Sequence, residues 1–121
     1  MKTKLINVLI VVAAFFTTAK ADTFAEGGLN YLTLSDNTLA VTKGTYSGTI
    51  TVPQTVTHSG KPYTVTEIGD SAFQKCTSAT SVTIPVTVTR LGKRAFDNCG
   101  ITEITIPVNV VDIDEGCFNA C

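Results

Sequence analysis

The sequence has no tryptophan, a single histidine and a single methionine, and only 16% of its 121 residues are charged. Nine Lys and Arg against ten Asp and Glu give a formal net charge of −1, so no basic surface for nucleic acid is expected. Low charge together with a hydrophobic fraction of 44% excludes a disordered polyampholyte. A Gly-X-Y period is also absent, which excludes collagen, and the length allows at most one small domain.

Catalytic motifs are missing as well. The sequence contains no phosphate-binding G-x-x-x-x-G-K loop and no G-x-G-x-x-G motif. The only histidine, His58, precedes Ser59 in a predicted turn, whereas a Ser-His-acid triad also needs a buried acid and a strained nucleophile turn. We expect His58 to be a solvated turn residue and the protein not to be an enzyme.

No metal site or cofactor is predicted. The four cysteines are 23, 18 and 4 residues apart and include no C-x-x-C pair, which disfavours zinc. Asp112, Asp114 and Glu115 lack the glycine and the spacing of a calcium loop. Ile113, which lies between them, is expected in the core.

The first twenty-one residues have the pattern of a secretory signal peptide. Lys2 and Lys4 precede an apolar run, Leu5–Phe16, and Ala19–Ala21 supplies a small-x-small cleavage pattern. The apolar run is too short to span a hydrocarbon core of roughly 30 Å. We expect cleavage after Ala21, a secreted or cell-surface protein, and no membrane insertion of the mature chain. An uncleaved anchor is the alternative.

The remaining chain contains an internal repeat. Threonine occurs 21 times and mostly alternates with valine and isoleucine, which is typical of half-buried strands. A nine-residue box, Ile68–Cys76, recurs as Leu91–Cys99 and Ile113–Cys121 at offsets of 23 and 22, and Ala79–Pro85 recurs as Ile101–Pro107. This period and these apolar positions predict a leucine-rich-repeat solenoid, because single units must stack to bury their apolar sides.

Stacking should place equivalent side chains in columns. The predicted apolar columns are Val65/Val88/Val110, Ile68/Leu91/Ile113, Phe73/Phe96/Phe118, Val82/Ile104 and Ile84/Ile106. Two charged columns alternate in sign, Glu67/Arg90/Asp112 and Asp70/Lys93/Glu115. Exposed ion pairs contribute only about 0–1 kcal/mol each, so their expected value lies in fixing the register. Each Ala-Phe box is predicted to form one short helical turn on the convex side.

Two segments depart from the period. Pro53 lies 32 residues before Pro85, and the nine extra residues predict a β-hairpin insertion with Ser59-Gly60 at its tip. Leu29–Leu34 and Thr38–Thr42 predict an N-terminal β-hairpin cap. The expected organisation is a signal peptide (1–21), a β cap (22–48) and a leucine-rich-repeat segment (49–121). That segment comprises a lead-in unit with the hairpin, two units and a partial third.

The predicted stack has no cap at its C-terminal end. The chain stops at Cys121, the last residue of a box, without the strand that would follow. An uncovered end exposes apolar groups and unpaired strand edges. We therefore expect either a truncated gene product or a chain that needs another chain to cover this end, including self-association through it.

The combination VTIP…VTRLGKRAFDNCGITEITIP…VVDIDEGCF resembles the BspA-like leucine-rich-repeat family of bacterial surface proteins. GTYSGTITVPQTVTHSGKPYTVTEIGDSAF is similar to the lead-in segment of that family, so the resemblance covers Thr45 to Cys121. It implies an exported, often cell-surface protein that adheres to host or matrix proteins or to other cells, and it supplies no catalytic residues. Cys117 departs from the pattern, because it replaces the alanine of the box, and we expect no surface-anchoring tail.

Three of the cysteines, Cys76, Cys99 and Cys121, share one phase of the repeat and are predicted to face the core. Helical turns would hold adjacent units about 10 Å apart, beyond the Cα separation of about 4.4–6.8 Å that a disulfide requires. We expect reduced, structural cysteines. A labile bridge or an intermolecular link is the alternative in an exported protein.

The outward positions of the repeated strands form the candidate partner-binding face. They are Thr80, Ser81, Thr83, Thr102, Glu103 and Thr105. A hydroxyl-rich face of low charge suits shallow, wet recognition of protein or glycan, although the same residues are also ordinary surface positions of strands. The favoured function is an exported, non-enzymatic, adhesin-like interaction module. The alternatives are a structural spacer or truncated remnant of a longer surface protein without a ligand, and an accessory domain of an enzyme.

Overall fold

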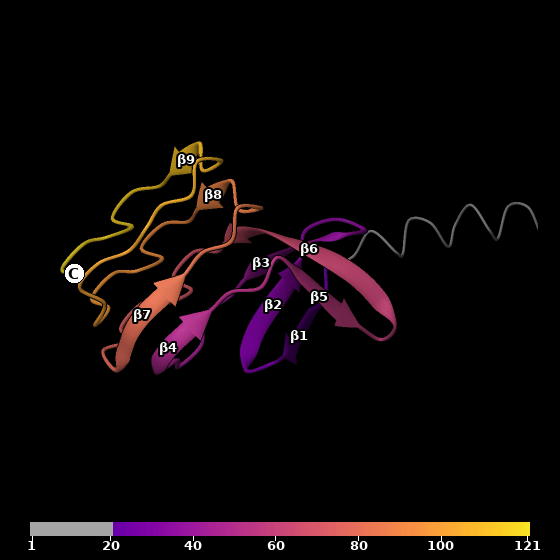
Figure 1. Cartoon of the computed structure of the whole chain (residues 1–121), viewed down its shortest axis with the longest axis horizontal. Coiled ribbons are helices and arrows are strands. Elements are labelled where there is room, and N and C mark those ends of the chain that lie inside the picture. The colour runs from indigo at the N-terminus through magenta and orange to yellow at the C-terminus, as the bar shows by residue number, and fades with distance from the viewer. Residues whose placement is uncertain (1–20) are drawn as a thin grey trace, which may run out of the picture.

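The computed structural model describes residues 21–121, so the predicted signal peptide lies outside the described residues apart from Ala21. The fold of the described part is built from short strands (Figure 1). These are β1 (Thr23–Glu26), β2 (Leu29–Thr33), β3 (Thr38–Val41), β4 (Gly48–Thr51), β5 (Thr55–His58), β6 (Lys61–Ile68), β7 (Ala79–Thr83), β8 (Arg90–Leu91) and β9 (Asp112–Ile113).

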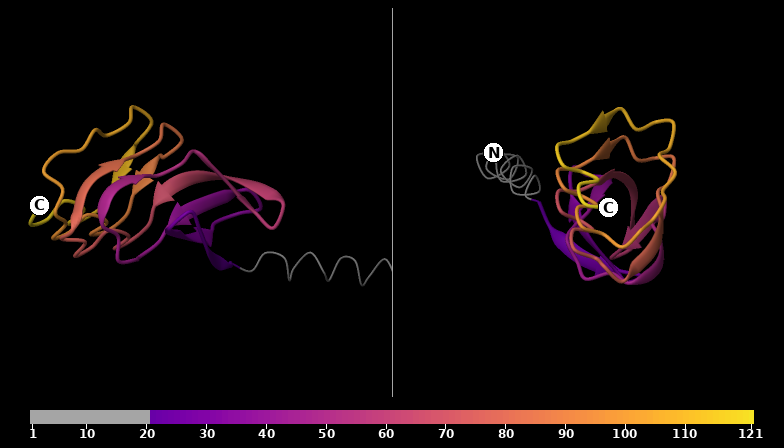
Figure 2. Two further views of the ribbon diagram at one scale, coloured as in Figure 1. Left: turned by 60° about the horizontal axis from the view of Figure 1, so that its bottom comes forward. Right: turned by 90° about the vertical axis from the view of Figure 1, so that its left-hand side faces the viewer.

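The strands wind into three stacked coils, which we define as coil 1 (residues 48–76), coil 2 (77–99) and coil 3 (100–121). One sheet has the order β1-β2-β3-β6-β8-β9, with β5 also paired to β6, and a second sheet joins β4 to β7. Figure 2 (right) looks onto the end of the stack at coil 3 and shows the coils lying over one another. The repeat architecture predicted from the sequence is confirmed.

The predicted offsets are present as strand registers. Ile68 of β6 pairs with Leu91 of β8, which pairs in turn with Ile113 of β9. Ile50 of β4 pairs with Val82 of β7 across the predicted offset of 32. The excess residues form the antiparallel β5–β6 hairpin, which projects beyond the stack (Figure 1). At its tip Ser59 and Gly60 have φ values of 52° and 78°, as a tight two-residue hairpin turn requires.

The core consists of the predicted apolar columns within coils 1 and 2, but the prediction that Ile113 lies in the core is wrong, because Ile113 in the outermost coil is 52% exposed with no further coil within residues 21–121 to cover it. The ring of Phe96 lies between the rings of Phe73 and Phe118, with centroids 5.2 Å and 5.4 Å away and planes within 4° of parallel. Phe73 and Phe96 are fully buried, and Phe118 in coil 3 is partly buried. Tyr46 continues the column in front of coil 1, with its ring centroid 5.0 Å from that of Phe73. Stacked aromatic rings add contact energy to the burial of their large apolar area.

The predicted helical turns are wrong, because residues 21–121 contain no α-helix. Within the first box, Ala72 and Gln74 donate hydrogen bonds to carbonyls three residues earlier, whereas Phe73 and Lys75 donate to Ala95 and Asp97 of the next coil. The boxes are therefore turns tied directly to their neighbours. Two positions of each box have positive φ values. Ser71, Arg94 and Gly116 occupy the first of these positions, and Lys75, Asn98 and Ala120 occupy the second. This left-handed backbone interrupts any helix.

The predicted cap hairpin is present as β2 and β3. The sequence prediction missed β1, which pairs antiparallel with β2. β3 also pairs in parallel with β6, so the cap continues the large sheet of the coils. Tyr46 fixes the cap to the coils. Its hydroxyl accepts a hydrogen bond from the backbone N–H of Asn30 at 3.1 Å and donates one to the backbone carbonyl of Thr42 at 2.7 Å. Burial raises the pKa of Tyr46, which keeps this phenol protonated as a donor.

Candidate functional site

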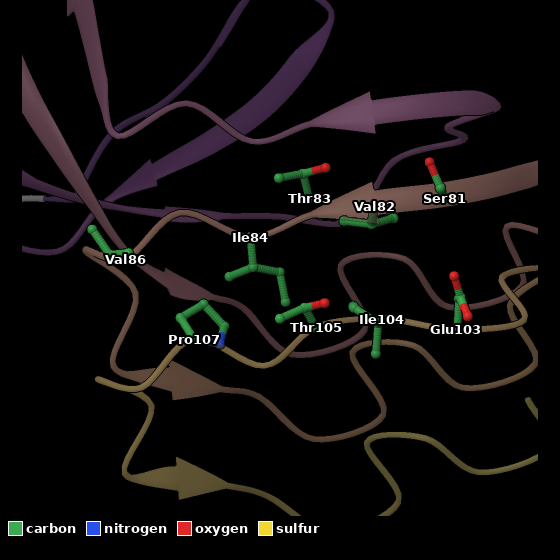
Figure 3. Close-up of a pocket in the computed structure, with 9 residues that line it drawn as sticks. All are labelled: Ser81, Val82, Thr83, Ile84, Val86, Glu103, Ile104, Thr105 and Pro107. Carbon is green, nitrogen blue, oxygen red and sulfur yellow. The ribbon is translucent and has the colours of Figure 1, made fainter.

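A groove lies between β7 and the equivalent segment of coil 3 (Figure 3). Its volume is about 470 Å³. The lining residues are Ser81, Val82, Thr83, Ile84, Val86, Glu103, Ile104, Thr105 and Pro107. Ser81 and Glu103 lie at one end, and Val86 and Pro107 lie at the other. The groove therefore follows the direction of β7.

Four of the six predicted binding residues line this groove, namely Ser81, Thr83, Glu103 and Thr105. Thr80 and Thr102 are exposed but lie outside its lining. The sequence prediction did not include the apolar residues of the groove. The prediction places Val82, Ile84 and Ile104 in core columns, but the spacing between the two segments leaves these residues in the lining of the groove.

The groove exists because coil 3 separates from coil 2 along this side. β4 pairs with β7 from Gly48↔Ala79 to Thr51↔Thr83, but no backbone hydrogen bond within residues 21–121 joins β7 to 101–106. Elsewhere coil 3 is bonded to coil 2, through β8–β9 pairing and through the Phe96 amide, which donates to the Cys117 carbonyl at 2.8 Å. The predicted strand at 101–106 is therefore not formed, and the predicted face is divided by the groove.

The chemistry of the groove is polar but weakly charged. Glu103 is the only ionisable residue in the lining, and the other polar groups are the hydroxyls of Ser81, Thr83 and Thr105. These groups can accept and donate hydrogen bonds around an apolar floor. Within residues 21–121, no three His, Cys, Asp or Glu side chains gather where they could hold a metal ion. The same part of the chain has no helix with the length and apolar character to cross a membrane.

Arg90 is the centre of the charged network. Its guanidinium donates to Glu67 Oε1 at 3.0 Å and to Asp70 Oδ1 at 3.3 Å, and it also contacts Asp114 Oδ2. Burial lowers the pKa of Arg90, but hydrogen bonds to Asp114 and Glu67 outweigh this effect and raise it, so the side chain stays charged.

The predicted charge columns are only partly correct. Arg90 lies in register with Glu67 and Asp112, as predicted, but its ion-pair partner in coil 3 is Asp114. In the second column the predicted Asp70–Lys93 ion pair is absent, because Asp70 accepts the backbone N–H of Lys93 at 2.9 Å and pairs with Arg90. The guanidinium of Arg90 reaches Asp114, two positions beyond its register partner Asp112, and Asp70, three positions beyond its register partner Glu67.

A second polar column was missed. The amide of Gln74 donates to Asp97 Oδ2 at 2.9 Å, and the amide of Asn119 donates to Asp97 Oδ1 at 3.0 Å. These hydrogen bonds, from Gln74 first and Asn119 second, lower the pKa of the Asp97 carboxyl. The signal was available in the sequence, since the three residues occupy the same position in consecutive boxes.

The prediction for His58 is wrong. His58 ends β5, where its Nδ1 lies 2.8 Å from Glu26 Oε2 and its ring stacks on Phe24 with centroids 3.9 Å apart. The side chain is half-buried and connects the β5–β6 hairpin to β1 of the cap. It is not a freely solvated turn residue because β1, which the sequence prediction missed, supplies both contacts.

The four cysteines are unpaired in the structure, and three of them, Cys76, Cys99 and Cys117, are buried. The prediction that Cys121 faces the core is wrong, because Cys121 is exposed at the end of the last coil. Burial raises the pKa of Cys99, and it raises that of Cys117 to about 11. The predicted spacing of about 10 Å between helical turns is wrong, because the boxes are hydrogen-bonded at the separation of ordinary strands. Burial therefore limits the access of solvent to Cys76, Cys99 and Cys117.

Residues 54–121 match the family model described as BspA type leucine rich repeat region (6 copies). The chain belongs to this BspA-type family. The resemblance stated from the sequence is thereby confirmed. A comparison with curated proteins returns no match.

Three solved bacterial structures are similar to this BspA-type chain. A leucine-rich repeat protein from Bacteroides ovatus is 32% identical with a TM-score of 0.72, over 81% of this chain and 27% of that one. One from Bacteroides capillosus is 28% identical with a TM-score of 0.67, over 77% of this chain and 71% of that one. A leucine rich cell surface protein from Faecalibacterium prausnitzii is 28% identical with a TM-score of 0.59, over 86% of this chain and 35% of that one. This BspA-type chain thus spans about a third or less of two of them.

Proposed function

We propose that this protein is an exported, non-enzymatic interaction module that binds a protein or glycan at the cell surface through the groove between β7 and coil 3. The observation that carries the proposal is the lining of that groove. Four residues chosen from the repeat pattern, Ser81, Thr83, Glu103 and Thr105, surround an apolar floor there. Hydroxyl and carboxylate groups beside aliphatic side chains provide hydrogen bonding and contact area for a partner.

Two further observations support this proposal. The lining of the groove offers hydroxyl groups, one carboxylate and aliphatic side chains, and no cysteine, histidine or lysine, which suits non-covalent binding of a partner. One of the similar structures is described as a leucine rich cell surface protein. A secreted or cell-surface location, following cleavage after Ala21, is part of the same proposal.

The experiment compares capture on defined surfaces by three forms of the protein. The groove variant carries Thr83→Ala, Glu103→Ala and Thr105→Ala, and a matched control carries Thr77→Ala, Thr89→Ala and Glu115→Ala, all exposed positions outside the groove. Biolayer interferometry measures binding to immobilised collagen, to mucin and to deglycosylated mucin. The last pair separates glycan from protein recognition.

The expected result is capture by the unmodified protein and the control, with at least tenfold weaker capture by the groove variant. Circular dichroism should show the same fold for all three forms. The proposal would be overturned if the groove variant bound as well as the control, or if the unmodified protein bound none of the surfaces. The second outcome would favour the spacer alternative.

A further inference from the structure

β7 has one paired edge and one free edge. On the paired edge, Thr51 lies in register with Thr83, and the Val52 amide donates to the Thr83 carbonyl at 3.0 Å. On the other edge, the backbone of β7 makes no hydrogen bond to coil 3 within residues 21–121. A free strand edge with unpaired N–H and C=O groups is a ready template for one more strand.

The groove lies directly along this free edge. Val82 and Ile84 in its lining are buried and Ile104 is half-buried, so these residues form an aliphatic floor. The hydroxyl-bearing Thr83 and Thr105 are exposed at its sides. Alternate side chains of an extended peptide point to opposite faces of the strand, so one set would meet this floor and the other would remain in solvent. A volume of about 470 Å³ lies within the range of sites that hold small ligands, which is enough for a short peptide segment.

The charge and composition of the groove favour a peptide over a glycan. Glu103 is its only charged residue, with no basic residue in the lining, so it would attract a Lys or Arg side chain at that end. The lining contains no aromatic residue, so a sugar ring would find no flat apolar surface on which to stack.

We propose that the groove binds an extended basic peptide segment of a partner protein as an added strand on the free edge of β7. Main-chain hydrogen bonds to β7 supply the affinity, apolar side chains at alternate positions contact Val82, Ile84 and Ile104, and a Lys or Arg pairs with Glu103. This inference rests on the proposed function and narrows it to one class of ligand and one mode of binding.

The test begins with a display library of linear hexapeptides, selected on the immobilised full chain. Counter-selection uses Thr105→Trp, whose ring fills the groove, and Thr77→Trp serves as the control with the same substitution at an exposed position elsewhere. Enriched peptides should alternate β-branched and polar residues and carry a Lys or Arg. The best one is then synthesised with N-methyl groups on the odd or on the even backbone nitrogens.

At least one N-methylated register should bind at least tenfold more weakly, because an added strand pairs through alternate amides. Glu103→Gln should weaken the basic peptide about three- to tenfold and leave its Lys→Ala analogue unaffected. The inference is overturned if no peptide is enriched over the Thr105→Trp form, or if neither methylated register loses affinity. If mucin capture still depended on the groove residues in those cases, the proposed function would stand while strand addition would be wrong.

Discussion

The ring of Phe73 lies parallel to that of Phe96, with centroids 5.2 Å apart, although 23 residues separate them in the chain. Phe118 repeats the relationship on the other side of Phe96 at 5.4 Å. The distance between rings is close to the spacing of paired strands. The Phe column therefore shows that adjacent coils remain in close contact at the boxes.

Phe96→Ala should lower the free energy of unfolding by about 3–5 kcal/mol, because it removes a fully buried ring between two others. Phe118→Ala is the matched control and should cost clearly less, since Phe118 is partly buried and stacks on one ring only. Urea denaturation followed by circular dichroism measures both. Equal losses for the two variants would contradict the partial burial of Phe118 at the end of the column, and no loss for Phe118→Ala would contradict the stacking of coil 3 on coil 2.

Arg90→Met should lower the free energy of unfolding by about 1–2 kcal/mol, because three carboxylates lose their shared cation. Lys93→Met, which removes a charge without a side-chain ion pair in residues 21–121, should change stability by less than about 0.5 kcal/mol. The difference between these variants should shrink in concentrated NaCl, since salt screens repulsion among the remaining acids. A difference unaffected by salt would argue that Arg90 acts through packing alone.

Asp97 should contribute to acid sensitivity. Its folded-state pKa is lowered from the ordinary value of 3.8 by hydrogen bonds from Gln74 and Asn119. The stabilisation is therefore fully present above about pH 4–5 and is lost as the pH falls through the lower folded-state value.

The unfolding temperature of Asp97→Asn, measured from pH 6 to pH 2.5, should approach that of the unmodified protein as the pH falls. Asp36→Asn is the control, because Asp36 is exposed, and its curve should run parallel to that of the unmodified protein. A constant difference between Asp97→Asn and the unmodified protein at all pH values would show that the charge of Asp97 contributes nothing.

The thiols should differ in reactivity. Cys121 is exposed, whereas Cys99 and Cys117 are buried with raised pKa values, so little of their thiolate is present at neutral pH. Ellman's reagent should therefore modify one thiol quickly in the native protein and the other three only in denaturant. Cys121→Ser should remove the fast phase. Rapid reaction of a thiol in that variant would show that the buried cysteines are accessible.

The sequence was sufficient to predict the columns, because a period of 22–23 residues constrains many positions at once. Aligning Phe73 with Phe96 also aligns Ile68 with Leu91 and Val65 with Val88, and all six are fully buried. The insertion could be predicted for the same reason, since nine residues had to be accommodated between Pro53 and Pro85 without breaking the register.

The conformation of the boxes could not be predicted, because non-glycine residues adopt the left-handed backbone there. Ser71, Lys75 and Arg94 have φ values between 53° and 61°, and none of these residue types indicates such a turn. The sequence provides two hints, Gly116 at the position of Ser71 and Arg94, and Asn98 at the position of Lys75. The preference of an Ala-Phe segment for a helix is overridden by hydrogen bonds to the next coil.

The candidate site was only partly predictable. The outward positions Ser81, Thr83, Glu103 and Thr105 follow from strand alternation, and they line the groove. The groove itself depends on missing backbone pairing between β7 and coil 3, and the repeat pattern predicts that pairing at every unit. The segment 101–106 matches the repeat in sequence, so the sequence alone does not indicate that its pairing with β7 is missing.

The hydrogen bonds between coils run along the axis of the stack, across strands that lie transverse to it. A tensile load along this axis would be carried by every junction in series, so the weakest junction would yield first and the others would follow one by one. Each junction that yields would release one coil of 22–23 residues, which is about 80 Å of extended chain. A protein of this design would lengthen stepwise under shear while the remaining coils stay intact.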